Sequence, residues 1–191
     1  RYLKRLSMDY GTDAAILNKV VHARVALKYF EDNIGLRMQP IRDCPDYYYA
    51  RSNDAVPEGR MLECEPFKGS DLGEWAEKTR LSPSMPYGFT HHDMFKYGGT
   101  ANIAKWDFNV MAERLTNDER CLGTGLAAYF VKGALDRGIA LHTDTSAEEL
   151  IADGTRVVGV RVIQNGRELF VKANKGVVVA VSSYERNQDH N

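Results

Sequence analysis

Residues 120–138, RCLGTGLAAYFVKGALDRG, and residues 156–180, RVVGVRVIQNGRELFVKANKGVVVA, contain the patterns that decide the fold class. In the first stretch the apolar residues recur at spacings of three and four, which predicts a helix. These residues are Leu126, Ala127, Phe130, Val131, Ala134 and Leu135. Arg137-Gly138 predicts the end of this helix, since glycine readily adopts the left-handed conformation found there.

The second stretch predicts β-structure. Val158, Val160 and Val162 alternate with other residues, as expected of a strand over residues 156–163. Asn165-Gly166 is typical of a type I′ turn, so residues 168–172 are expected to pair back in a hairpin. The uniformly apolar run 177–181 predicts a strand buried on both faces. With a further short strand expected at 139–142 and a connection at 145–151, the pattern predicts an α/β fold.

Upstream of residue 120 the pattern is less regular. Apolar residues at helical spacing predict a helix over residues 13–33, ended by Gly35. Residues 36–102 are rich in Pro, Gly and Tyr and predict a long irregular segment with short elements. A further helix is expected over residues 103–115, because Trp106, Val110, Met111 and Leu115 fall on roughly one face.

Composition excludes several classes of function. The 191 residues are 43% hydrophobic, which is enough for a core, and the net charge of -1 does not favour nucleic acid as a partner. Apolar runs are far shorter than a bilayer requires. The three cysteines are widely separated, without a Cys-x-x-Cys pair, so we expect a soluble, cytoplasmic protein that binds no metal.

The order of elements after residue 120 resembles the flavoprotein family of fumarate reductases, urocanate reductases and 3-ketosteroid dehydrogenases. The resemblance covers about residues 120–187. It implies an incomplete Rossmann-like FAD-binding domain of the glutathione-reductase type, with a three-stranded β-hairpin or meander. Residues 1–119 would be its helical and irregular portion with substrate-side loops, and residues 120–191 its adenosine-binding portion.

The resemblance also implies which residues contact FAD. Ala147 would contact the adenine, and the residues after the 177–181 strand would line the adenosine and pyrophosphate region, where such sheets bind ligands. The complete set of expected cofactor residues is Arg120, Gly123, Gly125, Ala147, Ala180, Val181, Ser182 and Ser183. Ser182-Ser183-Tyr184 departs from the Gly-Gly-Phe of the family, so two side chains replace a close backbone approach.

A second resemblance concerns the substrate side. Pro45-Asp46-Tyr47-Tyr48-Tyr49 is similar to the Asp-Tyr-Tyr-Pro segment of 3-ketosteroid dehydrogenases. It implies that Tyr47 or Tyr48 assists proton transfer at a bulky, apolar ketone, because a phenol can donate a hydrogen bond to a carbonyl or, once activated, accept a proton. An aromatic wall made of the same tyrosines is the alternative.

Several alternatives stay open. Within the same family a fumarate- or urocanate-type reductase needs arginine clamps, and residues 36–102 cluster tyrosines rather than arginines. A flavin-free binding or structural module is supported by Ser182-Ser183, and residues 120–187 also suit a ligand-free α/β unit. His91-His92 is expected in a polar loop, and Cys44 as a buried free thiol.

The Gly-x-Gly-x-x-Gly fingerprint that holds a pyrophosphate is not found in this chain, and we expect it upstream of Arg1. The partners expected are therefore an apolar small-molecule substrate and the missing remainder of the same flavoprotein.

The 191-residue chain is predicted to bind FAD only weakly by itself, because the helix N-terminus that would hold the pyrophosphate is elsewhere. Titration of the purified chain, followed by flavin fluorescence, checks this. Tight stoichiometric binding would place the phosphate site within these residues.

Overall fold

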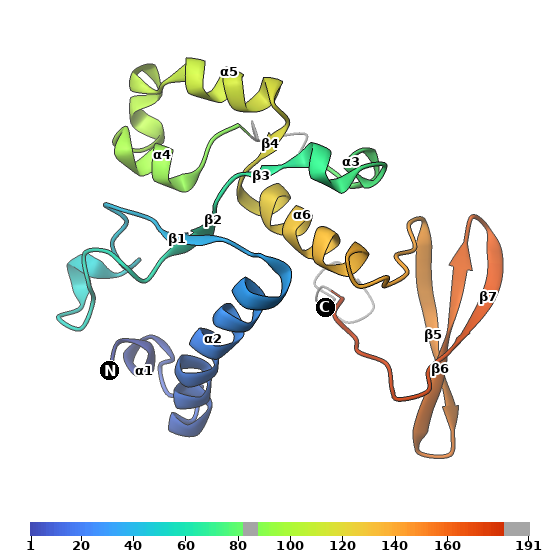
Figure 1. The fold of residues 1–191 in the computed structure, drawn as a ribbon. Helices are drawn as coiled ribbons and strands as arrows, with labels where there is room; N and C mark the ends of the chain where they lie inside the picture. Colours follow the sequence, from blue (N-terminus) through green and yellow to red (C-terminus); the bar gives the residue numbers. More distant parts are fainter. Residues whose placement is uncertain (82–87, 182–191) are drawn as a thin grey trace. The chain divides into compact units, whose positions relative to one another are not determined.

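The computed structural model describes residues 1–81 and 88–181, in two compact units over residues 1–140 and 141–191 (Figure 1). This boundary differs from the functional division expected at residue 120. The helices and 3-10 helices of the first unit are α1 (Tyr2–Leu6), α2 (Asp13–Ile34), η1 (Tyr49–Arg51), η2 (Gly69–Leu72), α3 (Trp75–Lys78), α4 (His91–Lys96), η3 (Thr100–Lys105), α5 (Phe108–Thr116) and α6 (Leu122–Leu135). Its strands are β1 (Met38–Pro40), β2 (Leu62–Cys64), β3 (Phe67–Lys68) and β4 (Glu119–Arg120).

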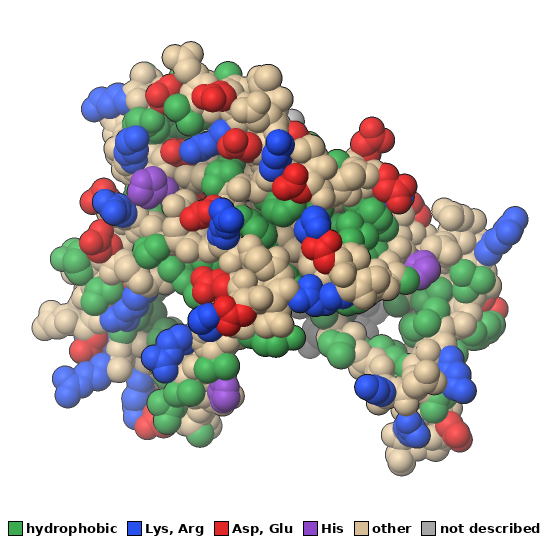
Figure 2. Space-filling model, viewed as in Figure 1, with side chains coloured by type: hydrophobic (Ala, Val, Ile, Leu, Met, Phe, Trp, Pro, Cys, Tyr) green, Lys and Arg blue, Asp and Glu red, His purple; other side chains and the backbone are tan. Residues whose placement is uncertain are grey.

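The long helix α2 confirms the prediction for residues 13–33. Its N-terminus is capped by Thr12, whose side chain accepts a hydrogen bond from the amide of Ala15, and Gly35 ends it in the left-handed conformation. None of its residues is fully buried. Leu17, Val21 and Val25 are exposed, and Figure 2 shows apolar side chains at the surface over this helix.

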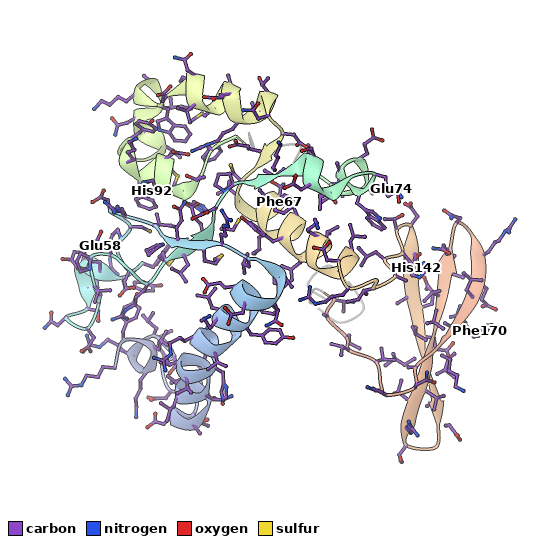
Figure 3. All side chains as sticks on the ribbon, in the orientation of Figure 1. Glu58, Phe67, Glu74, His92, His142 and Phe170 are labelled. Carbon is purple, nitrogen blue, oxygen red and sulfur yellow. The ribbon has the colours of Figure 1, made fainter. Side chains whose placement is uncertain are left out.

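Helix α6 lies at the centre of the first unit (Figure 1). Two small antiparallel sheets pack with it, one pairing β1 with β2 and the other β3 with β4. The rings of Phe67 and Tyr129 meet edge to face, with centroids 4.9 Å apart, and Phe67 lies beside α6 (Figure 3). The buried residues of this core are Leu36, Cys64, Phe67, Leu72, Ala128 and Tyr129.

The buried face of α6 differs from its most apolar face. Leu126 and Phe130 are partly exposed, whereas Gly125, Ala128 and Gly133 are buried. A Cβ added at Gly133 would lie 2.7 Å from the Ile34 side chain of α2. One added at Gly125 would overlap the carbonyl oxygen of Arg120. Small residues thus allow the neighbouring backbones to approach α6 closely.

The irregular segment predicted over residues 36–102 is confirmed for residues 36–81 and 88–102, but the helix expected over 103–115 is interrupted. Its first part is the 3-10 helix η3, and α5 begins after Asp107, whose carboxylate accepts hydrogen bonds from Asn109 and Val110. This local capping competes with a continuous helix. The expected apolar face is retained in part, since Trp106 and Met111 pack with Phe89 in a second buried cluster.

The second unit contains one antiparallel sheet in the order β5 (Thr145–Asp153), β6 (Arg156–Gln164) and β7 (Arg167–Lys172). The predicted hairpin is confirmed, with positive φ at both Asn165 and Gly166, as a type I′ turn requires. Direct pairing places two apolar rows on one face of the sheet. They are Leu150, Val160 and Val171, and Ala147, Val162 and Leu169.

Three local predictions in this region are wrong. Residues 145–151 form part of strand β5 instead of a connection, and residues 139–142 and 177–181 are not strands. A strand needs a neighbour for its backbone hydrogen bonds, and neither segment pairs with any strand of the described residues. Val178 is consequently 91% exposed instead of buried.

The close approach at Gly125 predicts a matched pair of stability effects. Gly125→Ala should lower the free energy of unfolding by about 1–3 kcal/mol, because the new methyl group overlaps the Arg120 backbone. Gly123→Ala should not be destabilising, since nothing lies within 4 Å of its added Cβ. Urea unfolding of the two variants measures the difference, and equal stabilities would contradict the proposed contact.

Candidate functional site

The tyrosines named by the sequence lie together at the surface of the first unit. Tyr47 is 90% exposed and Tyr48 is 44% exposed, and their rings meet edge to face with centroids 5.1 Å apart. Tyr49 follows as the first residue of η1. Neither Tyr47 nor Tyr48 is buried, so the described part of the first unit leaves both tyrosines accessible to a ligand.

The turn that carries these tyrosines is closed at its base by Asp46 and Val56. The amide of Asp46 donates to the carbonyl of Val56 at 3.0 Å, and the amide of Val56 donates to the Asp46 carboxylate at 2.8 Å. Asp46 is only 6% exposed. The loop over residues 46–56 is therefore fixed where it begins and ends, while its tyrosine side chains project outward.

Arg120, Gly123 and Gly125 are brought together where β4 leads into α6. Helix α6 has no side-chain cap, and Leu122 at its start has a positive φ of 54°. Gly123 is exposed, and nothing lies within 4 Å of a Cβ added to it, so there is open space at the helix start. Gly125 is instead buried against the Arg120 carbonyl and contributes to packing.

Arg120 is buried and connects neighbouring segments. Its guanidinium pairs with the Asp118 carboxylate at 3.1 Å and donates to the carbonyl of Ala76 at 2.9 Å. The Nη1 atom is buried without a hydrogen-bond partner among the described residues. The space above Gly69 is filled by the Asp118 and Arg120 side chains, which fixes this ion pair against η2.

Ala147, Ala180 and Val181 belong to the second unit, and all three are exposed. Ala147 pairs with Val162 in β5, next to a register shift, and β5 is an edge strand of its sheet. Some of its main-chain groups are therefore free of ladder hydrogen bonds. Ser182 and Ser183 lie outside the described residues.

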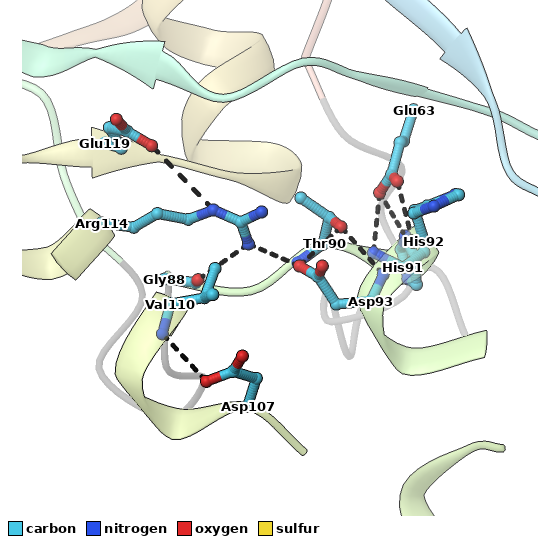
Figure 4. A network of polar contacts seen from close by, with 10 residues as sticks. All are labelled: Glu63, Gly88, Thr90, His91, His92, Asp93, Asp107, Val110, Arg114 and Glu119. Carbon is cyan, nitrogen blue, oxygen red and sulfur yellow. Dashed lines mark hydrogen bonds and ion pairs between the residues drawn. The ribbon is translucent and has the colours of Figure 1, made fainter. Parts of the chain in front are cut away.

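A polar network around α4 was not anticipated from the sequence (Figure 4). The buried carboxylate of Glu63 accepts hydrogen bonds from the amides of His91 and His92, at 2.7 and 2.8 Å. His91-His92 was expected in a polar loop, but these residues begin helix α4. The pattern Thr90-x-x-Asp93 was the available signal, because it forms a capping box at this helix start.

Arg114 joins this network from α5. It pairs with the Asp93 carboxylate and donates to the carbonyl of Gly88 (Figure 4). Burial opposes ionisation of Asp93, but hydrogen bonds from Arg114 and Thr90 outweigh it and lower the pKa of this carboxyl below its usual value. The adjoining pocket of about 440 Å³ is lined by both acidic and basic side chains, including Glu119 and Lys68.

The cysteines do not form a nucleophilic site. All three are free and buried, which confirms the prediction for Cys44. Burial raises the pKa of Cys64 to about 11 and that of Cys121 to about 12, so both are neutral thiols at physiological pH. In the part of the chain that the structure describes, no three His, Cys, Asp or Glu side chains converge to hold a metal ion.

Comparison with known protein families identifies the chain. A model described as "FAD binding domain" matches residues 2–190, which is nearly the whole sequence. The chain belongs to this family of FAD-binding domains. FAD is accordingly its cofactor. Within the first unit, the open space at Gly123 leaves room for a ligand beside the start of α6. Within the second unit, Ala147 lies on the edge strand β5 of its sheet.

Curated proteins named as a dehydrogenase and an oxidoreductase are similar to this FAD-binding domain. It is 25% identical to 3-oxosteroid 1-dehydrogenase of Comamonas testosteroni, over 98% of the chain and 36% of that protein. It is 33% identical to NADH:fumarate oxidoreductase of Klebsiella pneumoniae (strain 342), over 37% of the chain and 8% of that protein.

A solved structure is similar over the same extent. It is 3-ketosteroid delta1-dehydrogenase from Sterolibacterium denitrificans in complex with 1,4-androstadiene-3,17-dione, with a TM-score of 0.76 and 27% identity. The match covers 98% of this chain and 37% of that enzyme. The chain therefore spans little more than a third of the length of these steroid dehydrogenases. Among residues 1–81 and 88–181, no helix is both long and apolar enough to cross a membrane.

The lowered pKa of Asp93 predicts a pH-dependent effect of Asp93→Asn. A depressed carboxyl pKa contributes stability that is fully present above the ordinary value, about 4. That contribution is lost as the pH falls toward the lower pKa of the folded protein. The variant should therefore melt below the unmodified protein at pH 7, and the difference should shrink below about pH 4.

Thermal melting across pH 3 to 7 measures this difference, in steps of about half a pH unit, the scale on which a single carboxyl titrates. Glu113→Gln is a matched control, because Glu113 is an exposed carboxylate on the same helix as Arg114. A melting difference for Asp93→Asn that stays constant with pH would show that the Arg114 pair does not depend on the charge of Asp93.

Proposed function

We propose that the whole flavoprotein oxidises a bulky, apolar ketone such as a 3-ketosteroid. Bound FAD would accept a hydride at its N5 atom. The hydroxyl of Tyr47 or Tyr48 would assist removal of the accompanying proton, so that the substrate loses one hydride and one proton and gains a carbon–carbon double bond. The exposed tyrosine pair is the observation that carries this assignment.

Two features support the tyrosine assignment. The relatives that align with 98% of the chain are named as steroid dehydrogenases, and the solved one holds a steroid dienone. In this chain the loop beneath the tyrosines is fixed by the buried Asp46, whereas the phenol rings are exposed. A phenol presented in this way is suited to hydrogen-bond the oxygen of a ketone or to exchange a proton with its α-carbon.

The flavin contacts are proposed as follows. Gly123 and the start of α6 would lie near the cofactor, and Arg120 and Gly125 would hold that helix start in place. In the adenosine-binding portion, residues 120–191, Ala147, Ala180 and Val181 would contact the adenosine side, followed by Ser182 and Ser183. With the remainder of the protein, these elements would complete a Rossmann-like domain.

The exposed apolar surfaces support contacts with that remainder. Figure 2 shows apolar side chains on the visible faces of α2 and of the three-stranded sheet. Phe170, which projects from β7 (Figure 3), is 66% exposed, and Val178 is almost fully exposed. Apolar patches of this kind mark surfaces that pack against other protein segments.

A fumarate-type reductase is the second candidate. It is favoured by the 33% identity to NADH:fumarate oxidoreductase, although that match covers only 70 residues. Reduction of a dicarboxylate needs cationic groups that hold its two carboxylates. The two candidates are therefore distinguished by assaying fumarate reduction beside ketosteroid oxidation.

The tyrosine assignment is tested by Tyr47→Phe and Tyr48→Phe in the full-length flavoprotein. Phenylalanine keeps the ring and removes only the hydroxyl. The variant that lacks the reacting hydroxyl should lose about a hundredfold or more in turnover, with unchanged flavin content. Oxidation of 4-androstene-3,17-dione with a dye as electron acceptor measures the rate, and the flavin absorbance measures the cofactor.

Tyr10→Phe is the control, because Tyr10 is also exposed, at 94%, but lies outside the loop over residues 46–56. Full activity in both loop variants would exclude these tyrosines from the chemistry. Reduction of fumarate without any ketosteroid oxidation would favour the second candidate.

A further inference from the structure

We propose that Asp46 is a positioning residue, which fixes the turn that presents Tyr47 and Tyr48. This inference rests on the proposed function of the tyrosine pair and extends it to a side chain that does not itself reach the surface. Asp46 is 6% exposed, although an isolated carboxylate is costly to bury. Its burial is explained by the contacts it makes with the backbone of the loop.

Asp46 contacts the loop through three separate groups. Its amide and its carboxylate both bond to the backbone of Val56, which closes the base of the loop. Its carbonyl oxygen accepts a hydrogen bond from the amide of Tyr49 at 2.8 Å, which closes the turn containing Tyr47 and Tyr48. One residue therefore fixes both the base of the loop and the turn.

Arg60 connects the Asp46 carboxylate to the other side of the turn. Its Nη1 atom lies 3.4 Å from the Asp46 carboxylate, and its Nη2 donates to the carbonyl of Asp54. The same guanidinium lies over the ring of Tyr2, 5.0 Å from the centroid. The hydroxyl of Tyr2 in turn accepts a hydrogen bond from the amide of Tyr48 at 3.3 Å.

These contacts link Asp46 to Arg60, Arg60 to Tyr2, and Tyr2 to Tyr48, which lies in the same turn as Asp46. We call this set of contacts the Asp46 circuit. The exposed tyrosine side chains have few neighbours to restrain them, so their placement depends on the backbone of the turn. Small displacements of a catalytic group lower the rate strongly. The charge of Asp46 matters because it holds Arg60 as well as the Val56 amide.

The test is Asp46→Asn in the full-length holoenzyme. The amide is nearly isosteric and keeps one oxygen for the Val56 amide, but it loses the charge that attracts Arg60. Turnover of 4-androstene-3,17-dione should fall by about tenfold, with unchanged flavin content, because the reacting hydroxyl is misplaced. Arg60→Lys removes the stacking and fork geometry from the other side of the same pair and should give a similar loss.

A double-mutant cycle separates positioning from general destabilisation. Asp46→Asn is combined with whichever tyrosine-to-phenylalanine variant loses activity. Once the hydroxyl is absent its position no longer matters, so Asp46→Asn should have little further effect on turnover. Glu63→Gln is the matched control, since Glu63 is also a buried carboxylate that holds backbone amides, but at α4. Its effect should add to that of the tyrosine variant.

The outcomes distinguish this inference from the proposed function. If a tyrosine variant loses activity but Asp46→Asn and Arg60→Lys add their full effects to it, the positioning role is wrong and the catalytic assignment stands. If both tyrosine variants keep full activity, the catalytic assignment fails and the positioning role fails with it. Full activity of Asp46→Asn in the unmodified background also overturns the positioning role.

Discussion

The packing of the first unit depends on how closely its other segments approach helix α6. At Gly125 the helix contacts the carbonyl of Arg120, and at Gly133 it contacts Ile34 at the end of α2. A larger residue at either position would separate these elements, because packed interiors tolerate little added volume. The same approach brings Ala128 and Tyr129 against the short sheets and leaves Gly123 exposed at the helix start. At the helix start, Gly125 therefore allows close packing, whereas Gly123 stays exposed.

Buried charged side chains hold the irregular parts of the first unit in place. These parts lack the regular backbone hydrogen bonds of helices and sheets. Asp46 bonds to the backbone at the other end of its own loop, whereas Glu63 and Arg120 bond to backbone groups of segments that are distant in sequence. A buried charge is tolerated when hydrogen bonds and an opposite charge compensate for its lost hydration. Such contacts fix loop geometry more specifically than apolar packing does, since each requires a defined direction. The loop over residues 46–56 is fixed in this way, which gives exposed side chains a defined position.

Short sequence patterns predicted correctly those elements whose ends are set by neighbouring residues. Thr12 and Gly35 delimit α2, and Asn165-Gly166 determines the hairpin, through short-range capping and turn geometry. The strand expected over 177–181 failed because strand formation depends on partners, and the described residues contain none beside it. The circuit around Asp46 could not be predicted either, as Tyr2 and Arg60 are far from it in sequence. A sequence motif identified the tyrosines, whereas the contacts that hold their turn in place are tertiary and have no local sequence signal.

The pairing of three arginines bears on the choice between the two substrate classes that we consider, a neutral ketone and a dicarboxylate. Arg60 is engaged by Asp46 and Tyr2, Arg114 by Asp93 and Gly88, and Arg120 by Asp118 and Ala76. A guanidinium already paired with a carboxylate would have to release it before binding a substrate carboxylate, and breaking a buried pair is costly. Tyr47 and Tyr48 are exposed and require no such release. Arg60, Arg114 and Arg120 are therefore poorly placed to clamp a dicarboxylate, whereas Arg51, which lies in the loop of the tyrosines, is exposed. The three paired arginines favour the neutral ketone that we propose over a dicarboxylate.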